Sequence, residues 1–251
     1  MRIACVLDLP MDAARPRLAP SETTACAVAL DLRRRYPGTT VEIVALGASS
    51  ATPVLADLLR LGADAATLLA DPAFEGGDAL ARGLVLAACL RDGGFDGVLA
   101  GSRTADGAAG EVPPILAELL GLPACVDVDR GVEFDAREGS ALVDVDDGRG
   151  IATYRVLLPA VLAVAHRHAW SLPHLRLRDA GADVADRLRV LDRAALGLAV
   201  EAVGVAGSSV RPDGPLEAPA ARDGRSAPVV VRPDDEGIEQ VVALLARRGL
   251  V

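Results

Sequence analysis

The sequence predicts an α/β fold: a parallel sheet covered by helices on both faces, then an antiparallel β region, a C-terminal arm and a terminal helix. Three observations lead to this prediction. Short, almost continuously apolar segments alternate with helical ones as far as Pro123, as in a parallel sheet buried on both faces. After Pro123, strand-like segments follow one another without helices. From Ser208 to Pro228 the chain is rich in Pro, Gly, Ser and charge. We therefore expect a domain over residues 1–207 and an arm with a helix over residues 208–251.

The segments before Pro123 supply the expected parallel strands and their helices. The strands span residues 2–9, 41–46, 66–70 and 98–100. The helices that follow them span residues 20–36, 51–61, 78–91 and 112–120. Ser21 is expected to cap the first helix. Gly62 is expected to close the second helix, and Gly93 with Gly94 stops the third.

The segments after Pro123 supply an antiparallel region at the edge of the sheet. Its strands are expected at residues 124–129, 132–135, 140–146, 151–157 and 160–165, separated by Gly-rich acidic turns. The last helix is expected at residues 238–250, with an apolar stripe formed by Ile238, Val241, Val242, Leu244 and Leu245. This helix follows a long arm. We therefore expect it to pack on a partner or to reach back across the domain.

The turn between the fourth strand and the fourth helix carries the most chemical information. Residues 101–110 read Gly-Ser-Arg-Thr-Ala-Asp-Gly-Ala-Ala-Gly. Such a turn offers free backbone N–H groups and the positive end of a helix dipole, which suit the phosphate of a nucleotide. It is neither G-x-G-x-x-G nor a Walker A loop, and it has no lysine. From these residues alone, an anion-binding turn and an ordinary surface loop both stay open.

The composition argues against several classes of function. The 251-residue chain has a formal net charge of −9, which argues against a nucleic-acid partner. No apolar run reaches the roughly 20 residues that span a bilayer, and Asp8 comes too early for a signal peptide. We therefore expect a cytoplasmic protein without membrane insertion. Lysine is absent, which excludes a Schiff-base lysine mechanism.

The sequence shows no metal-binding or catalytic grouping of residues. The cysteines are widely spaced among apolar neighbours, so we expect all of them to be reduced and buried in the core: Cys5, Cys26, Cys89 and Cys125. His166 and His168 lack a nearby acid or a third ligand, so no metal site is expected. No nucleophile, histidine and acid stand at catalytic spacing. We therefore expect no bond-making chemistry by this chain.

Three motifs resemble the beta subunit of electron transfer flavoprotein. The first is the turn itself, with Gly101, then Asp106, then a helix ending in Leu120-Gly-Leu-Pro123. The second is Leu58-Leu-Arg-Leu-Gly-Ala-Asp64. The third is Leu158-Pro-Ala-Val161 followed by Ser171-Leu-Pro173. The chain is similar to this family over nearly its whole length. The resemblance implies a nucleotide-binding fold of the adenine nucleotide alpha hydrolase-like type.

The resemblance implies a heterodimer in which an alpha subunit holds the working FAD and is wrapped by the C-terminal arm of this chain. The pair would carry electrons between a flavin-dependent dehydrogenase and a downstream acceptor, as a carrier and not an enzyme. This chain would hold AMP, or a second FAD if the complex bifurcates electrons. Ser102 stands where the family has a basic residue, and loop 166–170 is shorter than the family's loop. These departures indicate a divergent member with a specialised dehydrogenase.

The same resemblance assigns residues to two sites. The cofactor-binding candidates are Val6, Leu7, Leu46, Gly101, Arg103, Asp106, Gly107, Ala108, Ala109 and Gly110. The turn amides and Arg103 would hold the phosphate, and the strand ends would flank the adenosine. Leu172 matches the leucine that the family inserts into a pocket of the dehydrogenase, with Trp170 as the next docking candidate. Asp106 as a helix cap, Arg103 as a surface residue and Leu172 as a core residue stay open.

Two other classes of protein share the alternating pattern. A stand-alone adenine-nucleotide-binding module resembling universal stress proteins would be homodimeric. An ATP-using enzyme would have the same nucleotide-binding fold. The long stretch beyond Pro123 argues against the first, and the lack of a phosphate-handling motif argues against the second.

Overall fold

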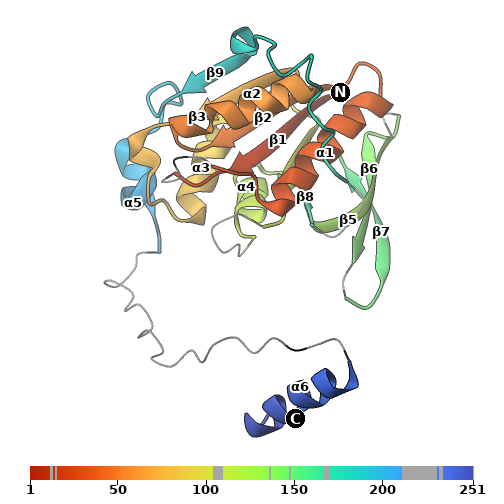
Figure 1. The fold of residues 1–251 in the computed structure, drawn as a ribbon. Helices are drawn as coiled ribbons and strands as arrows, with labels where there is room; N and C mark the ends of the chain where they lie inside the picture. Colours follow the sequence, from red (N-terminus) through yellow and green to blue (C-terminus); the bar gives the residue numbers. More distant parts are fainter. Residues whose placement is uncertain are drawn as a thin grey trace. The chain divides into compact units, whose positions relative to one another are not determined.

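In the part of the chain that the computed structural model describes, nine strands form one sheet. The described residues are 1–11, 14, 16–103, 110–135, 137–146, 148–166, 170–210, 231 and 234–250. The strands are β1 (Arg2–Asp8), β2 (Thr40–Leu46), β3 (Ala65–Leu69), β4 (Gly97–Gly101), β5 (Ala124–Asp135), β6 (Ser140–Asp146), β7 (Ile151–Leu157), β8 (Ala160–Val164) and β9 (Leu188–Leu191). Their order across the sheet is β7-β6-β5-β8-β4-β1-β2-β3-β9 (Figure 1).

The centre of the sheet confirms the predicted parallel core. β1 lies between β2 and β4 and is parallel to both, and β2 continues to β3. Every residue of β1 after Arg2 is buried. Burial on both faces explains why these strands are apolar along their whole length instead of alternating.

Two further parallel strands correct the prediction. Residues 160–165 were expected in the antiparallel region, but β8 lies between β4 and β5 and is parallel to both. All five of its residues are buried and apolar, as in a central parallel strand. β9 extends the sheet beyond β3 and was not predicted. It has only four residues, among them Arg189, so no apolar run marks it in the sequence.

The predicted antiparallel region lies at the opposite edge of the sheet. β6 is antiparallel to both β5 and β7. The two strands expected at residues 124–135 are in fact one strand, β5, which pairs with β8 near its start and with β6 along the rest. Its register shifts on either side of residue 130, and Asp127 has a φ of 54°. These irregularities let one strand change neighbours, and they produce the apparent break in the sequence pattern.

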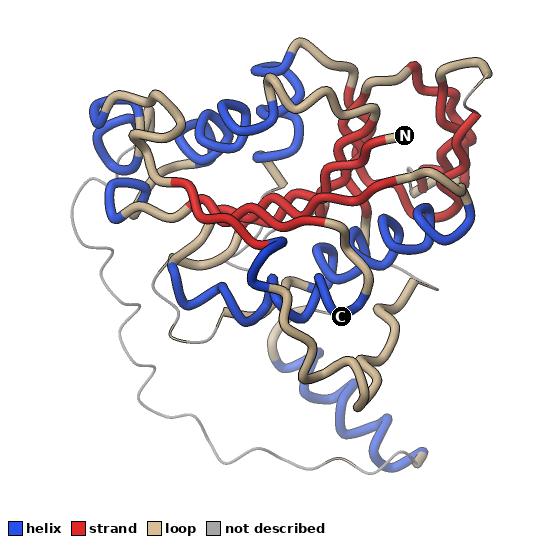
Figure 2. The backbone as a smooth tube through the Cα atoms, turned by 90° about the horizontal axis from the view of Figure 1, so that it is seen from above, coloured by secondary structure: helices blue, strands red, loops and turns tan. Residues whose placement is uncertain are grey.

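In the first unit, helices cover both faces of the sheet, as predicted (Figure 2). The described helices of this unit are α1 (Pro20–Arg35), α2 (Thr52–Leu61), α3 (Ala79–Leu90), α4 (Val112–Leu120) and α5 (Gly204–Gly207), and α6 (Asp235–Arg247) belongs to the second unit described below. α1 and α2 pack on one face with Cys5 and Leu7, and α3 and α4 on the other with Ala4 and Val6. Neighbouring residues of β1 therefore serve two different cores. Among the described residues, no helix is long and apolar enough to cross a bilayer.

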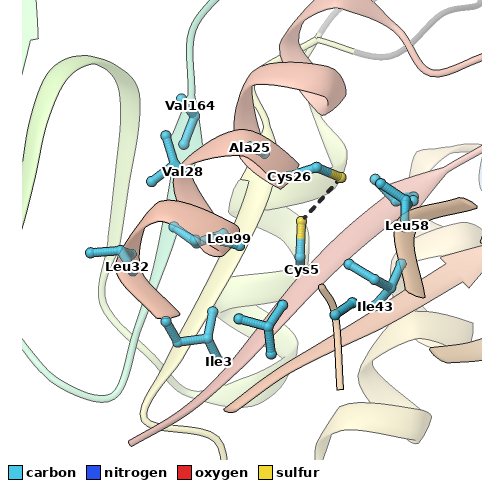
Figure 3. Close-up of a cluster of buried hydrophobic side chains, with 14 of the residues drawn as sticks. Ile3, Cys5, Ala25, Cys26, Val28, Leu32, Ile43, Leu58, Leu99 and Val164 are labelled. Atoms are coloured by element: carbon cyan, nitrogen blue, oxygen red, sulfur yellow. Dashed lines mark hydrogen bonds between the residues drawn. The ribbon is translucent and has the colours of Figure 1, made fainter. Parts of the chain in front are cut away.

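The cysteines are free thiols, as predicted. Cys5 and Cys26 are fully buried under α1, with their sulfur atoms 3.7 Å apart (Figure 3). The expectation of burial is wrong for Cys89 and Cys125, which are half-buried because each packs only at the margin of a core.

The described chain divides into two units, Met1–Arg211 and Pro212–Val251. The first residues of the expected arm, Ser208–Val210, belong to the first unit and form hydrogen bonds with Asp78 at the beginning of α3. The Asp78 N–H donates to Ser208 Oγ at 2.9 Å. Its carboxylate accepts the backbone N–H groups of Ser209 and Val210 at 2.7 and 2.9 Å. The remainder of the expected arm lies outside the described residues.

In the second unit, α6 confirms the predicted terminal helix with shifted bounds. The helix begins at Asp235 because the Asp234 side chain accepts the N–H of Gly237 at 2.9 Å and caps it. It ends at Arg247, just before Gly249, whose φ is 67°.

Candidate functional site

The predicted cofactor site lies at the carboxyl edge of the parallel sheet, where β1, β2 and β4 end. Asp8 is opposite Leu46 on β2, and Val6 is opposite Ala100 on β4. The first four helices each follow a parallel strand and begin at this same edge. Open parallel sheets bind ligands at this edge. The topology therefore brings the predicted strand ends and the turn after β4 together.

Val6, Leu7 and Leu46 are packed into the cores at these strand ends. Their exposed fractions are 2%, 0% and 1%. Val6 and Leu46 pack under α3 and α4, and Leu7 packs under α1 and α2. Val6 and Gly101 line a cavity of about 10 Å³ at this edge, which is room for about one water molecule. These residues set the shape of the edge and offer little exposed side-chain surface.

Gly101 and Gly110 are explained by the path of the backbone. A Cβ atom on Gly101 would lie 2.7 Å from the Glu22 nitrogen and 2.8 Å from Ser21 Oγ. Only glycine lets the first turn of α1 come this close to the end of β4. Gly110 has a φ of 72°, and a Cβ there would collide with the Ser102 carbonyl oxygen. The two glycines therefore fix where the turn leaves β4 and where it returns toward α4.

Ser21 and Arg103 join α1 to this turn. The Arg103 N–H donates to Ser21 Oγ at 3.2 Å, and the Ser21 hydroxyl donates to the Arg103 carbonyl. The prediction that Ser21 caps α1 is therefore wrong. Ala19 occupies the cap position, and the Glu22 carboxylate accepts the Ala19 N–H at 2.7 Å. An acidic side chain at the third helical position thus satisfies the N–H of the cap residue, which is one half of a capping box.

The other predicted turn residues, Asp106, Gly107, Ala108 and Ala109, lie outside the described residues.

Two buried carboxylates and a partly buried arginine lie at this edge, and sequence reasoning missed all of them. Asp8 and Glu22 have exposed fractions of 6% and 2%. Arg82 reaches across from α3, and its Nε donates to the Asp8 carboxylate at 2.8 Å. Glu22 accepts the Asp8 N–H at 2.8 Å. Burial raises the pKa of Glu22 to about 7, although the backbone N–H groups of Ala19 and Asp8 favour its charged form.

Two sequence signals could have identified this cluster. Asp8 ends an otherwise apolar strand, and Glu22 stands at the third position of a helix that begins with proline. The arrangement suits ligand binding by backbone groups more than chemistry, because both carboxylates already accept hydrogen bonds within the fold. Among the described residues, no three His, Cys, Asp or Glu side chains are grouped closely enough to hold a metal ion.

The predicted docking residues follow β8. Trp170 and Leu172 are partly buried and pack against the core on the α1 face. The Arg35 guanidinium lies 5.9 Å from the centre of the Trp170 ring. Farther along the same segment, Leu177 is 94% exposed and was not singled out from the sequence. A leucine within a basic stretch carries no pattern that distinguishes an exposed position from a covered one.

Comparison with known proteins points to one family. The model of the electron transfer flavoprotein domain matches residues 11–186. The electron transfer flavoprotein subunit beta of Clostridium acetobutylicum is 35% identical over 144 residues, 57% of this chain and 55% of that protein. The caffeyl-CoA reductase-Etf complex subunit CarD of Acetobacterium woodii is 32% identical over 146 residues, 58% of this chain and 55% of that protein.

A longer match extends the similarity along the chain. The electron transfer flavoprotein subunit beta of Mycobacterium tuberculosis is 29% identical over 255 aligned positions, covering 97% of this chain and 90% of that protein. By contrast, this chain spans only about half the length of the Clostridium and Acetobacterium relatives that it matches.

Proposed function

We propose an electron-carrier function for this chain, which belongs to the beta subunit family of electron transfer flavoproteins. In this proposal it pairs with an alpha subunit that holds FAD, and the pair moves electrons between a cytoplasmic flavin-dependent dehydrogenase and a downstream acceptor. The observation that carries the proposal is the family match over residues 11–186, which includes both Gly101 and the segment around Leu172.

A nucleotide at the carboxyl edge is the second part of the proposal. Gly101 and Gly110 set the path of this turn, because side chains there would collide with the first turn of α1 and with the Ser102 carbonyl oxygen. Arg103 adjoins the turn and could supply a cation for the phosphate. The proposed binding residues are Val6, Leu7, Leu46, Gly101, Arg103, Asp106, Gly107, Ala108, Ala109 and Gly110. AMP is the proposed ligand, or a second FAD if the complex bifurcates electrons.

In this proposal the residues of this chain bind and position the nucleotide, and they take no part in bond-making chemistry. A flavin, when bound, supplies the hydride and single-electron chemistry. The glycines keep the backbone close, and the ion pair between Arg82 and Asp8 holds α3 against the end of β1. A rigid edge of this kind lowers the cost of ordering the site when the ligand binds.

Co-expression with an alpha-type subunit tests this function. We expect a yellow 1:1 complex, whereas the chain alone should be colourless and less stable. Denaturing the complex and separating the supernatant by reverse-phase chromatography should release AMP beside FAD. About two FAD per complex would support bifurcation instead. A stable homodimer that binds nucleotide without a second chain would contradict the proposal and favour a stand-alone binding module.

Docking to the dehydrogenase is proposed for the segment that contains Trp170 and Leu172. The segment directly follows β8, which is paired on both sides within the sheet, so its start is held by the fold. It also contains the strongly exposed Leu177 and the arginines Arg176 and Arg178. A fixed base with an exposed apolar and charged outer part suits recognition of a second protein.

A further inference from the structure

We propose that Asp78 is a positioning residue for assembly with a second chain, because its carboxylate fixes the point at which the C-terminal arm leaves the first unit. The residues that it holds are the first three of the expected arm, Ser208–Val210, which we name the anchor segment. The inference rests on the proposed function, which identifies the second chain as an alpha-type subunit of electron transfer flavoprotein.

The two oxygen atoms of the Asp78 carboxylate have different partners. Oδ1 accepts the N–H of Ala81 at 2.9 Å and so caps α3. Oδ2 accepts the N–H groups of Ser209 and Val210 at 2.7 and 2.9 Å. Although burial opposes it, the N–H groups of Ala81, Val210 and Ser209 lower the pKa of Asp78. A charged acceptor is therefore present at neutral pH, and hydrogen bonds to such an acceptor are about twice as strong as neutral ones.

Hydrogen bonds, more than apolar packing, hold the end of the anchor segment. Val210 is 74% exposed, and Ser209 is exposed as well. Burial of these two side chains therefore contributes little to their placement. Ser208 is buried and adds a bond in the reverse direction, because its Oγ accepts the Asp78 N–H at 2.9 Å. The Ser208 hydroxyl in turn donates to the Gly204 carbonyl at 2.8 Å, which joins the anchor segment to α5.

The part of the fold that supports the anchor segment is itself held in place. Val203 is buried in the core under α3 and α4. Gly204 has a φ of 56°, and a Cβ there would collide with the Ala73 carbonyl oxygen. α5 lies beside the start of α3 (Figure 1). One turn into α3, Arg82 pairs with the buried Asp8 at the end of β1. The anchor segment is thus attached to a rigid part of the first unit.

A fixed starting point lowers the cost of assembly. A segment that becomes ordered only when a partner binds loses conformational entropy in that step, and its affinity is lower for that reason. The hydrogen bonds of Asp78 order the backbone of Ser209 and Val210 before a partner binds. Asp78 therefore acts through the arm and need not touch the second chain.

Asp78→Ser separates the two functions of this carboxylate. A serine hydroxyl can accept the Ala81 N–H and keep α3 capped, but it has one oxygen atom instead of two, so the anchor segment loses its acceptor. Hydrogen exchange of the full chain, followed by NMR, measures the result. We expect the amide protons of Ser209 and Val210 to exchange at least about tenfold faster than in the unchanged protein, while that of Ala81 keeps its rate.

Asp71→Ser is the matched control, because Asp71 has the same pair of functions elsewhere in the first unit. One of its oxygen atoms accepts the Ala73 N–H at 2.8 Å and caps the short helix η2 (Pro72–Phe74). The other accepts the Arg193 N–H at 3.0 Å. Asp71→Ser should therefore speed exchange at Arg193 and leave the rate at Ser209 unchanged.

Dissociation of the complex with the alpha-type subunit tests the positioning role. Exchange of a fluorescently labelled chain into the preformed complex measures the dissociation rate, which is where most differences in affinity between related complexes lie. We expect Asp78→Ser to dissociate at least about tenfold faster than the unchanged protein, and Asp71→Ser to match the unchanged protein. Ser208→Ala removes the reverse bond and should act in the same direction as Asp78→Ser.

Each contrary result has its own meaning. Unchanged exchange at Ser209 in Asp78→Ser would overturn the anchoring by Asp78. Faster exchange with an unchanged dissociation rate would overturn the positioning role and leave Asp78 as a helix cap. Equally fast dissociation of Asp71→Ser would also overturn it, because general destabilisation would then explain both variants. If the unchanged protein forms no complex with an alpha-type subunit, the proposed function fails and this inference fails with it, whereas a complex that is indifferent to Asp78→Ser overturns this inference alone.

Discussion

The two candidate sites of this protein lie in the same unit but are built in opposite ways. At the carboxyl edge of the sheet, Asp8 and Glu22 are buried, and Gly101 touches the first turn of α1. In the segment after β8, Leu177 is 94% exposed, and a crevice of about 580 Å³ opens to solvent between Trp170, α1 and the end of α2. The first site is therefore part of the structural core, whereas the second lies on the surface of the protein.

This difference predicts how function and stability are coupled at each place. Substitutions at the carboxyl edge disturb packing and buried charge, so they should lower stability together with any nucleotide binding. Substitutions of exposed residues in the docking segment, such as Leu177, remove few contacts within the chain, so they should change partner recognition with little cost in stability. The variants below test this contrast, beginning with the largest expected effect on the free energy of unfolding.

The largest effect is expected from the buried ion pair. Arg82→Met removes the guanidinium that donates to the Asp8 carboxylate, and the exposed fractions of the two side chains are only 12% and 6%. We expect a loss of about 4 kcal/mol, because a charge remains in a buried place without this partner. Urea unfolding measures the change. Arg34→Met, which breaks an exposed pair beside the crevice, should cost less than about 1 kcal/mol. Equal losses of stability in Arg82→Met and Arg34→Met would contradict the contrast between the two sites.

The second test concerns the close approach at the end of β4. In Gly101→Ala, the new Cβ would meet the Ser21 and Glu22 backbone, which cannot move without displacing α1. We expect a loss of about 3 kcal/mol in urea unfolding, together with weaker nucleotide binding. Gly181→Ala is the matched control, because a Cβ there meets nothing within 4 Å. Unchanged stability of Gly101→Ala would show that α1 can shift away from the end of β4 at little cost in free energy.

How well the sequence predicts each site depends on the range of the interactions that form it. The apolar runs of β1, β2 and β4 depend on local periodicity, and their positions are predicted closely. β8 was assigned to the wrong kind of pairing, because pairing is decided by which distant strand lies beside it. The cluster of Asp8, Glu22 and Arg82 was missed for the same reason: its contact between Arg82 and Asp8 spans 74 positions.

The docking segment shows the opposite case. The resemblance drew attention to Trp170 and Leu172 through a short motif, but a motif does not specify which side chains are covered. Packing against α1 decides that Leu172 is partly buried and Leu177 exposed. The crevice is formed by α1, the end of α2 and residues 170–173, which are separate in sequence, so no local sequence pattern predicts it.

The third test uses the pH dependence of stability. Burial raises the folded-state pKa of Glu22 from 4.5 to about 7. Between these two values the folded protein holds a proton that the unfolded chain has released, so stability falls as pH rises through this window. We expect the protein to be about 2 kcal/mol more stable near pH 5.5 than near pH 7.5 from this group alone.

Glu22→Gln serves as the control for this pH effect. It should flatten the pH dependence of urea unfolding between these two conditions, because the titrating group is gone. It should also cost about 1 kcal/mol at low pH, since both oxygens of the carboxyl group face a backbone N–H and can accept it, whereas the amide nitrogen cannot. An unchanged pH profile in Glu22→Gln would assign the dependence to another group.

The smallest effect on stability, and the sharpest on partner recognition, is expected from the two leucines of the docking segment. Leu172→Ala removes a side chain that packs partly buried against the core and should cost about 1 kcal/mol. It should slow electron transfer with the dehydrogenase more than about tenfold at unchanged flavin content, because an apolar side chain of the proposed docking segment is lost. Leu177→Ala should leave stability unchanged, since its side chain is 94% exposed. Stopped-flow reduction of the flavin, with flavin content measured in parallel, separates the two effects. If Leu177→Ala slows transfer and Leu172→Ala does not, the recognition element is the exposed Leu177 side chain, and Leu172 has no part in docking.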